Sequence, residues 1–369
     1  MPKNKCTLLI DGNWLLISRF SVMNKGDMFS KNKSKEFLDV STQKLVDMMA
    51  RSINVMLNKY QFIDNIILIS DGGSWRKQLP IPKQLEDITY KGNRSGTKSQ
   101  DVDWGSVFGS LSSLVKSCSI KNITTSSQNN IEGDDWIWYW SRRLNDDGIS
   151  CIIWSSDHDL IQLVQKKGDA FTAWYNERKG INKLIFPDSM EWKEPEPGDL
   201  DFFMRPIPYK TRLVGDIESK MGNIEYVDPN TIINNKVICG DSGDNIKSVI
   251  RVNKKGRLYG VSEKDWQKIS EKLKIYNIYD LINHKNDIAK ELLGMKKFAG
   301  YNISIDDIIE MIDYNIHLVW LNEQIIPESV TAAMNQQEYK QIDVDYFRGS
   351  YKTLLDDDKD IMDVFESIC

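Results

Sequence analysis

The sequence predicts an α/β fold with a mostly parallel central sheet flanked by helices, followed by a helical C-terminal region. Three apolar runs predict buried strands, CTLLID at 6–11, NIILISD at 65–71 and SCIIWSSD at 150–157. Between these runs, apolar residues recur at about the helical period. Strands that alternate with helices are typical of a parallel sheet covered on both faces.

Two amphipathic helices are predicted between the strands. The first follows the apolar positions Leu45, Met49, Ile53, Met56 and Tyr60, and the second follows Val107, Leu111, Leu114, Val115 and Cys118. Beyond Asp244 the pattern is mainly helical, with a clear apolar face over 305–320. We therefore expect an N-terminal domain at 1–245 and a helical C-terminal region at 246–369.

Two stretches interrupt this pattern. Residues 72–100 are polar, punctuated by glycine and proline, and basic toward their end. They predict a long crossing loop or short helices, and a loop of this length is usually functional or mobile. Residues 187–229 are rich in proline, glycine and aspartate and predict a second irregular stretch.

The composition excludes several classes of protein. Of 369 residues, 41% are apolar and 27% are charged, which is ordinary for a globular protein. No apolar run reaches the ~18 residues of a membrane span, and no secretory h-region begins the chain, so we expect a cytoplasmic protein. The five cysteines form no C-x-x-C pair and only three histidines occur, so a histidine- or cysteine-based zinc site is poorly supported.

Carboxylates gather where the predicted strands end, and parallel strands bring such ends to one edge of the sheet. Hard oxygen ligands suit Mg²⁺ or Mn²⁺, and two such ions about 3.5–4 Å apart can hydrolyse a phosphodiester. Each acid alone has a simpler interpretation as a helix cap or turn residue, and this is strongest for Asp135. All five groups together favour metal binding; they are Asp11; Asp71; Glu132, Asp134 and Asp135; Asp157 and Asp159; and Asp241 and Asp244.

Two stretches carry cations without any acid, although the net charge of the chain is −5. Phosphate neutralisation dominates non-specific binding to nucleic acid, so both stretches are candidate contacts. Solvated surface loops are the alternative. The first stretch contributes Lys91, Arg94 and Lys98, and the second contributes Lys247, Arg251, Lys254, Lys255 and Arg257. Tyr90, at the start of the first stretch, could stack on a base or merely pack against the base of the loop.

The motifs resemble those of the flap-endonuclease and 5′-3′ exonuclease family, most closely its phage-type RNase H enzymes. EGDD at 132–135 resembles the family's E-x-D-D motif, SSDHD at 155–159 its S/T-x-D-x-D motif, and GDSGDNI at 240–246 its G-D-x-x-D-N-I motif. YKGNR at 90–94 resembles the base of its helical arch. The order also matches, from LLID and ILISD onward, over residues 5 to 250.

The resemblance implies a PIN-like 5′ nuclease domain and a role for each group. Asp71, Glu132 and Asp134 would hold a first Mg²⁺ or Mn²⁺ with Asp11 in its outer shell, and Asp157, Asp159 and Asp241 a second, with Asp244 nearby. Lys91 matches the arch lysine that approaches the scissile phosphate, and Arg94 lies in the same motif. Arg76 stands where the family often has an aromatic–arginine pair that contacts phosphate. The family's usual duplex anchor is missing after GDSGDNI, where SVIRVNKKGRLYGVSE stands instead.

The resemblance therefore implies a metal-dependent 5′ nuclease acting on DNA or RNA–DNA duplexes with 5′ ends or flaps, in a replication setting such as primer removal. It suggests a single-stranded-DNA-binding protein or a sliding clamp as partner, a phage origin and hence the host cytoplasm. We expect a monomer. The alternatives are a PIN-type endoribonuclease and a structure-specific binding protein with a degenerate site. A haloacid-dehalogenase phosphatase fits poorly, since Gly12 and Asn13 break the D-x-D opening.

Overall fold

The structure is a computed structural model that describes residues 6–23, 27–59, 62–85, 90–92, 101–120, 124–178, 181–185, 187, 210–214, 225–226 and 228–338. The chain forms two compact units. Unit 1 takes its described residues from 1–73, 99–227 and 328–369, and unit 2 from 74–98 and 228–327. This division differs from the predicted one at 245, because the described residues of 74–92 and those of 228–245 pack with the later helices rather than with the sheet.

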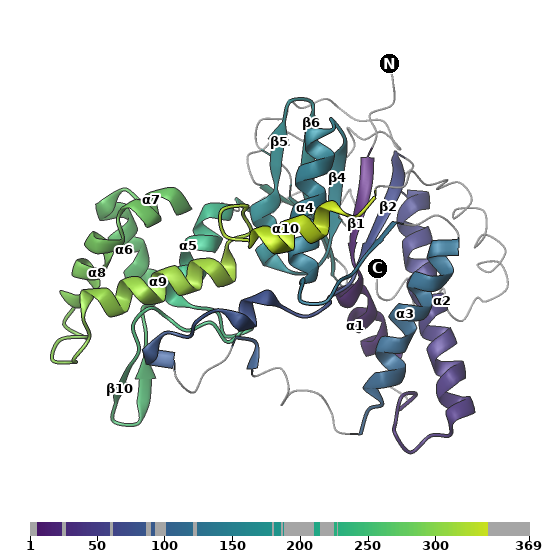
Figure 1. Cartoon of the computed structure of the whole chain (residues 1–369), viewed down its shortest axis with the longest axis horizontal. Coiled ribbons are helices and arrows are strands. Elements are labelled where there is room, and N and C mark those ends of the chain that lie inside the picture. The colour runs from purple at the N-terminus through teal and green to yellow at the C-terminus, as the bar shows by residue number, and fades with distance from the viewer. Residues whose placement is uncertain are drawn as a thin grey trace. The chain divides into compact units, whose positions relative to one another are not determined.

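The centre of unit 1 is a parallel sheet (Figure 1). Strand β1 (Cys6–Asp11) lies between β2 (Ile63–Ile69) and β4 (Ser150–Trp154), parallel to both. Strands β3 (Thr124–Ser126) and β6 (Ala170–Arg178) extend it in parallel beyond β2 and β4. The predicted mostly parallel sheet flanked by helices is confirmed, and the strands predicted at 65–71 and 150–157 end two and three residues earlier than expected.

The sheet continues beyond β6 with antiparallel strands. Strands β5 (Gln165–Lys167) and β7 (Ile181–Ile185) both pair with β6, and β8 (Lys210–Val214) and β9 (Glu225–Tyr226) follow. The last two lie in the stretch predicted to be irregular. Their short polar sequences carry no apolar alternation that would have indicated a strand.

Helices cover both faces because successive strand residues point to opposite sides. Leu8 and Ile10 pack in one core with helices α1 (Gly12–Met23), α2 (Lys35–Lys59) and α3 (Trp104–Ile120). Helix α4 (Gly133–Asp146) contacts β1, β2, β4 and β6. Its Trp136 and Trp140 are fully buried, and Trp140 Nε1 donates to Ser126 Oγ at 2.8 Å. The aromatic residues of α4 are therefore core residues.

A short 3-10 helix, His158–Leu163, follows β4 and carries Asp159 in its first turn. Later in the chain, α10 (Glu328–Asn335) returns to unit 1 and contacts α4. Arg143 Nη1 on α4 donates to the Gln337 carbonyl at 3.1 Å. The residues after 327 are thus part of the sheet-containing unit rather than of the helical one.

Unit 2 is mainly helical, as predicted. Its helices are α5 (Pro229–Cys239), α6 (Glu263–Leu273), α7 (Ile278–Asn283), α8 (Lys285–Leu293) and α9 (Ile305–Val319). The apolar face of α9 packs in the core through Ile308 and Ile312. The buried Asn315 amide on α9 donates to the carbonyls of Val237 and Lys247, both at 2.8 Å, and so ties α5 to the loop after it.

Two features of unit 2 differ from its α-helices. Residues 75–85 form two short 3-10 helices, Trp75–Gln78 and Lys83–Leu85. Strands β10 (Val252–Lys254) and β11 (Arg257–Tyr259) form a hairpin inside the stretch predicted to be helical. Across both units, no helix among the described residues is long and apolar enough to cross a membrane.

Candidate metal centre

Three aspartates lie at the carboxyl ends of three neighbouring strands of unit 1. Asp11 is the last residue of β1, Asp71 follows β2 by two residues, and Asp157 follows β4 by three. The parallel registers pair Asp11 with Ile69 and Ile10 with Trp154. The register therefore brings the three carboxylates to one edge of the sheet.

Asp11 and Asp157 are joined through Ser155. The Ser155 hydroxyl donates to Asp11 Oδ2 at 2.7 Å and accepts from the Asp157 backbone N–H at 3.0 Å. The Trp14 N–H donates to the other Asp11 oxygen at 3.0 Å, and Asp157 Oδ1 accepts from the Asp159 N–H at 2.9 Å. These hydrogen bonds hold the ends of β1 and β4 in a fixed geometry.

Asp71 is held at the N-terminus of α4. Its Oδ1 accepts from the Gly133 backbone N–H at 2.6 Å, and its Oδ2 accepts from the Asn13 side-chain amide. A carboxylate is favoured there by the helix dipole and by the free N–H groups of the first turn. A Cβ on residue 133 would lie 2.9 Å from Asp71 Oδ1, so a larger residue there would push the Asp71 carboxylate away from the start of α4.

The acids at the start of α4 differ in their surroundings. Glu132 is 4% exposed and precedes the helix, whereas Asp134 is half-buried in its first turn. Asp135 is fully buried, and its Oδ2 accepts from the Glu132 N–H at 3.3 Å as part of a capping box. This capping box agrees with the simpler interpretation of Asp135, in which it begins the helix that presents Glu132 and Asp134.

The electrostatics of this edge fit a divalent cation. Burial, together with the negative charges of Asp71 and Asp157, raises the pKa of Asp11 to about 6, although hydrogen bonds from Trp14 and Ser155 act in the opposite direction. Within the described part of the chain, Asp11, Asp71 and Asp157 form no ion pair with lysine or arginine. Clustered carboxylates without a cation repel one another, and their oxygens are the ligands that Mg²⁺ and Mn²⁺ prefer.

The arrangement is open rather than a closed cage. Among the residues that the structure describes, no three histidine, cysteine, aspartate or glutamate side chains converge tightly enough to enclose an ion. Mg²⁺ usually keeps several waters and takes only one or two protein carboxylates directly. An open edge of carboxylates is compatible with this mode of coordination.

In unit 2, Asp241 and Asp244 already have cationic partners. Asp241 Oδ2 pairs with Lys236 Nζ at 2.6 Å, and its Oδ1 accepts from the Gly243 N–H at 2.7 Å. Burial raises the pKa of Asp241, but these contacts outweigh it and the net shift is downward. Asp244 Oδ2 lies 3.9 Å from Lys91 Nζ. Both acids are thus neutralised within their own unit.

Lys91 is held in place by its backbone as well as by Asp244. Its N–H donates to the Asp244 carbonyl at 2.9 Å, its φ of 54° is left-handed, and its ammonium lies 4.9 Å from the Tyr90 ring centroid. Tyr90 itself is 6% exposed and belongs to the core of unit 2. Of the two roles predicted for Tyr90, packing at the base of the loop agrees with this burial, whereas stacking on a base does not.

The assignment of Arg76 to phosphate contact is contradicted by its surroundings. Its side chain is 2% exposed, stacks on Trp75 with 4.6 Å between Cζ and the ring centroid, and donates from Nε to the His317 carbonyl at 3.2 Å. It stabilises unit 2 rather than meeting phosphate. Arg94 and Lys98 lie outside the described residues. Lys247 and Arg251 are half-buried, whereas Lys254, Lys255 and Arg257 are exposed on the β10–β11 hairpin.

Several residues that shape the site escaped the sequence analysis. Ser155 and Asn13 bond the strand-end aspartates, Gly133 admits Asp71, and Lys236 neutralises Asp241. Ser155 and Gly133 stand inside the quoted motifs, so their position was a usable signal. Nothing in the sequence pointed to Lys236, which reaches Asp241 only because α5 ends between them.

Comparisons with known proteins agree with this architecture. The family model for the 5′-3′ exonuclease N-terminal resolvase-like domain matches residues 6–191. A 5′-3′ exonuclease of Mycoplasmopsis pulmonis (strain UAB CTIP) is 24% identical over 329 residues, which cover 88% of this chain and 89% of that protein.

Solved structures from bacteriophage T5 share the fold. One protein co-crystallised with metal ions is 17% identical, covers 95% of this chain and 98% of its own, and has a TM-score of 0.52. The T5 flap endonuclease in a pseudo-enzyme–product complex with DNA and metal ions is also 17% identical, covers 95% of this chain and 99% of its own, and has a TM-score of 0.51.

The raised pKa of Asp11 predicts a pH-dependent stability in the absence of metal. A carboxyl whose folded-state pKa of about 6 exceeds its ordinary 3.8 contributes stability below pH 3.8, and this is lost as the pH rises through 6. In EDTA, Asp11→Asn should be more stable than the wild type by roughly 1–3 kcal/mol near pH 7.5, with a smaller difference near pH 4.5. Thermal unfolding at both pH values measures this, with the exposed Asp147→Asn as control. An equal difference at both pH values would show that Asp11 is not destabilised by its charge.

Proposed function

The chain belongs to the 5′-3′ exonuclease family, and we therefore propose that it is a metal-dependent 5′ nuclease that hydrolyses phosphodiester bonds at or near the 5′ ends of DNA or RNA–DNA duplexes, including flaps. The observation that carries this proposal is the edge of unit 1, where Asp11, Asp71 and Asp157 lie at the ends of neighbouring strands and form no ion pair with a lysine or arginine among the described residues. Primer removal in replication is the biological setting that this activity fits.

The carboxylates divide into two sets by the elements that present them. Glu132 and Asp134 flank the start of α4, where Asp71 accepts from the Gly133 N–H, and these three would hold one ion, while Asp157 and Asp159 follow β4 and would hold the other. Two Mg²⁺ or Mn²⁺ ions there would supply an activated water and stabilise the leaving oxygen. Asp11 lies between the two sets. Hydrogen bonds from Trp14 and Ser155 fix its carboxylate, so we assign it the role of holding the neighbouring carboxylates in position.

The acids of unit 2 have a different part in the proposal. By resemblance, Asp241 and Asp244 belong to the second metal. Each is compensated by a lysine within its unit, so direct coordination would require Lys236 or Lys91 to be released. We assign Asp244 the role of positioning Lys91, whose cation would stabilise charge that develops on the scissile phosphate.

The β10–β11 hairpin carries exposed cations that are not compensated by one another. Lys254 and Arg257 stand directly opposite each other, although like charges in a cross-strand pair are destabilising. Lys255 and Gly256 form the two-residue turn between the strands, and both have the positive φ that such a turn requires. A polyanion would relieve the charge repulsion, so we assign this hairpin to the phosphate backbone of the duplex.

Removing a strand-end carboxylate should abolish cleavage while the protein still folds. We expect Asp71→Asn and Asp157→Asn to lose more than about 100-fold in rate, since each removes a charge needed around the metals. The assay uses 5′- and 3′-labelled flap, nicked and RNA-primed duplexes with Mg²⁺ or EDTA. Asp147→Asn, exposed at the end of α4, is the matched control. A fully active Asp157→Asn enzyme would sink the proposal.

Lys91→Ala should slow the chemical step without weakening metal binding. The lost cation no longer stabilises the transition state, and a decrease of roughly 10²–10³-fold in single-turnover rate is expected. Mg²⁺-dependent thermal stabilisation, measured in parallel, should match the wild type. Unchanged single-turnover rates would remove Lys91 from the mechanism and leave it as a partner of Asp244 alone.

Neutralising the hairpin should lower duplex affinity and its dependence on salt. Each phosphate contact contributes about 0.9 to the slope of log K against log salt, so Lys254→Ala/Arg257→Ala should reduce the slope by about 2. Fluorescence anisotropy on a labelled duplex in EDTA measures it. Lys264→Ala/Lys268→Ala on the exposed face of α6 removes the same charge elsewhere. Equal effects from both double variants would show only a general charge effect.

A further inference from the structure

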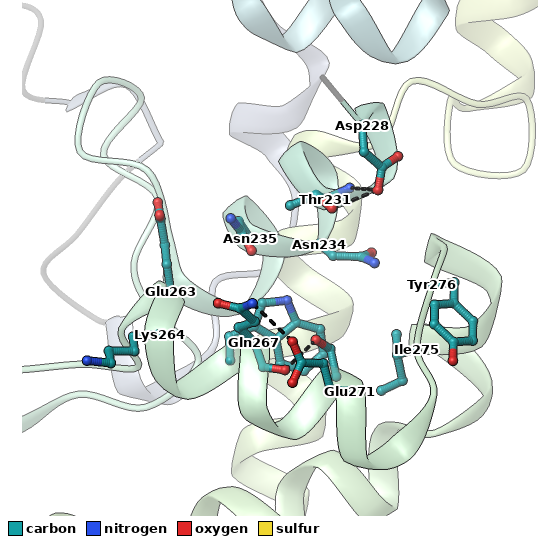
Figure 2. Close-up of a pocket in the computed structure, with 12 residues that line it drawn as sticks. Asp228, Thr231, Asn234, Asn235, Glu263, Lys264, Gln267, Glu271, Ile275 and Tyr276 are labelled. Carbon is teal, nitrogen blue, oxygen red and sulfur yellow. Dashed lines mark hydrogen bonds between the residues drawn. The ribbon is translucent and has the colours of Figure 1, made fainter. Parts of the chain in front are cut away.

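A polar pocket of about 570 Å³ lies between α5 and α6, entirely within unit 2 (Figure 2). Thr231, Asn234 and Asn235 line it from α5, Gln267 and Glu271 from α6, and Tyr276 from the segment that follows α6. The volume is within the range of pockets that bind ligands. We refer to it as the α5–α6 pocket.

Asn234 points to a ligand. Its side chain is 4% exposed, and its Oδ1 has no hydrogen-bond partner among the described residues. Figure 2 shows the amide extending from α5 toward the side of the pocket where Tyr276 lies. Buried polar groups are almost always hydrogen-bonded, so an orphaned amide at a pocket wall marks a position that a bound molecule can satisfy.

The charge of the pocket identifies the class of ligand. Asp228, Glu263 and Glu271 oppose a single cation, Lys264. Asp228 is engaged in the start of α5, accepting from the N–H groups of Asn230 and Thr231. Glu271 accepts from Gln267 through Oε1 at 3.0 Å, and its other oxygen can accept from a ligand. This surface repels phosphate and therefore does not suit the nucleic acid that the hairpin is assigned to.

Tyr276 adds an aromatic surface to these acceptors. It is 68% exposed, the largest fraction among the exposed large apolar side chains that the structure describes. A guanidinium or ammonium group is attracted to an aromatic face and to carboxylates, and its alkyl stem packs on the ring. The pocket is also larger than one side chain requires, and its asparagine and glutamine amides match the donors and acceptors of a peptide backbone.

We propose that the α5–α6 pocket binds a short extended segment of a partner protein and receives an arginine or lysine side chain between Glu271 and Tyr276. Asn234 bonds to the same segment. None of the residues that line this pocket belongs to the carboxylate edge or to the basic hairpin, and the proposal goes beyond the nuclease activity. It gives the protein a place to be recruited by a basic partner while its nucleic-acid contacts stay free.

The test compares two peptides that differ only in charge. The full-length protein is titrated with a pentapeptide that has a central arginine between glycine and serine residues, and with the same peptide carrying neutral citrulline. Binding is followed by NMR shifts of side-chain amides. We expect the arginine peptide to bind at least about tenfold more tightly, because the citrulline form loses the charged hydrogen bonds. Equal affinities would overturn the proposal.

Variants locate the binding. Glu271→Gln, Asn234→Ala and Tyr276→Ala should each weaken the arginine peptide about tenfold, whereas Asp287→Asn and Tyr259→Ala, outside the pocket, should not. Asn234→Ala should not lower the melting temperature, because no hydrogen bond is lost in the free protein. Pocket variants that bind like the wild type, or an Asn234→Ala protein that is less stable and binds normally, would contradict the assignment.

Two further arms complete the test. Spermidine at the same concentration should bind more weakly than the arginine peptide, since it cannot bond to the amides through a backbone. Tighter binding by spermidine would reassign the pocket to a free polyamine. Flap cleavage by Glu271→Gln should equal that of the wild type, so a failure of peptide binding leaves the nuclease proposal unaffected and the reverse also holds.

Discussion

Repulsion among strand-end carboxylates is the constraint on which the rest of unit 1 depends. The parallel register of β2, β1 and β4 brings Asp71, Asp11 and Asp157 to one edge, where burial and the charges of its two neighbours raise the pKa of Asp11. The fold tolerates this arrangement because backbone N–H groups and the Ser155 hydroxyl donate hydrogen bonds to these carboxylates and so offset part of the cost. A protein that retains such an arrangement without cationic partners is prepared for a cation from solution.

In unit 2, by contrast, the acids of the sequence motif have cationic partners. Its two motif aspartates are paired with Lys236 and Lys91, and exposed cations gather on the β10–β11 hairpin. The acidic α5–α6 pocket is a third type of surface in the same unit. An overall charge of −5 therefore says little about any one face, because surfaces of opposite sign serve different ligands.

Much of the sheet and of its acidic edge could be predicted from sequence. Apolar runs that end on an acid located β1, β2 and β4, because a strand that is buried on both faces needs a nearly continuous run of apolar residues. The side chains that hold the acids could not be predicted, because Ser155 and Asn13 meet Asp11 and Asp71 only after three strands align. Arg76 was misassigned for a related reason: it stands in a polar stretch that predicted a surface loop, although Leu85 and Tyr90 of that stretch belong to the core of unit 2.

The most direct test of the account is to locate the metal. Crystals grown with Mn²⁺ should give anomalous scattering peaks beside the carboxylates of Asp71, Glu132 or Asp134 and of Asp157 or Asp159, and these peaks should vanish in Asp71→Asn and Asp157→Asn respectively. That result would establish the acidic edge as the metal centre. Peaks found only at Asp241, at the acidic α5–α6 pocket or nowhere on the protein would contradict the account and leave the strand-end aspartates as structural residues.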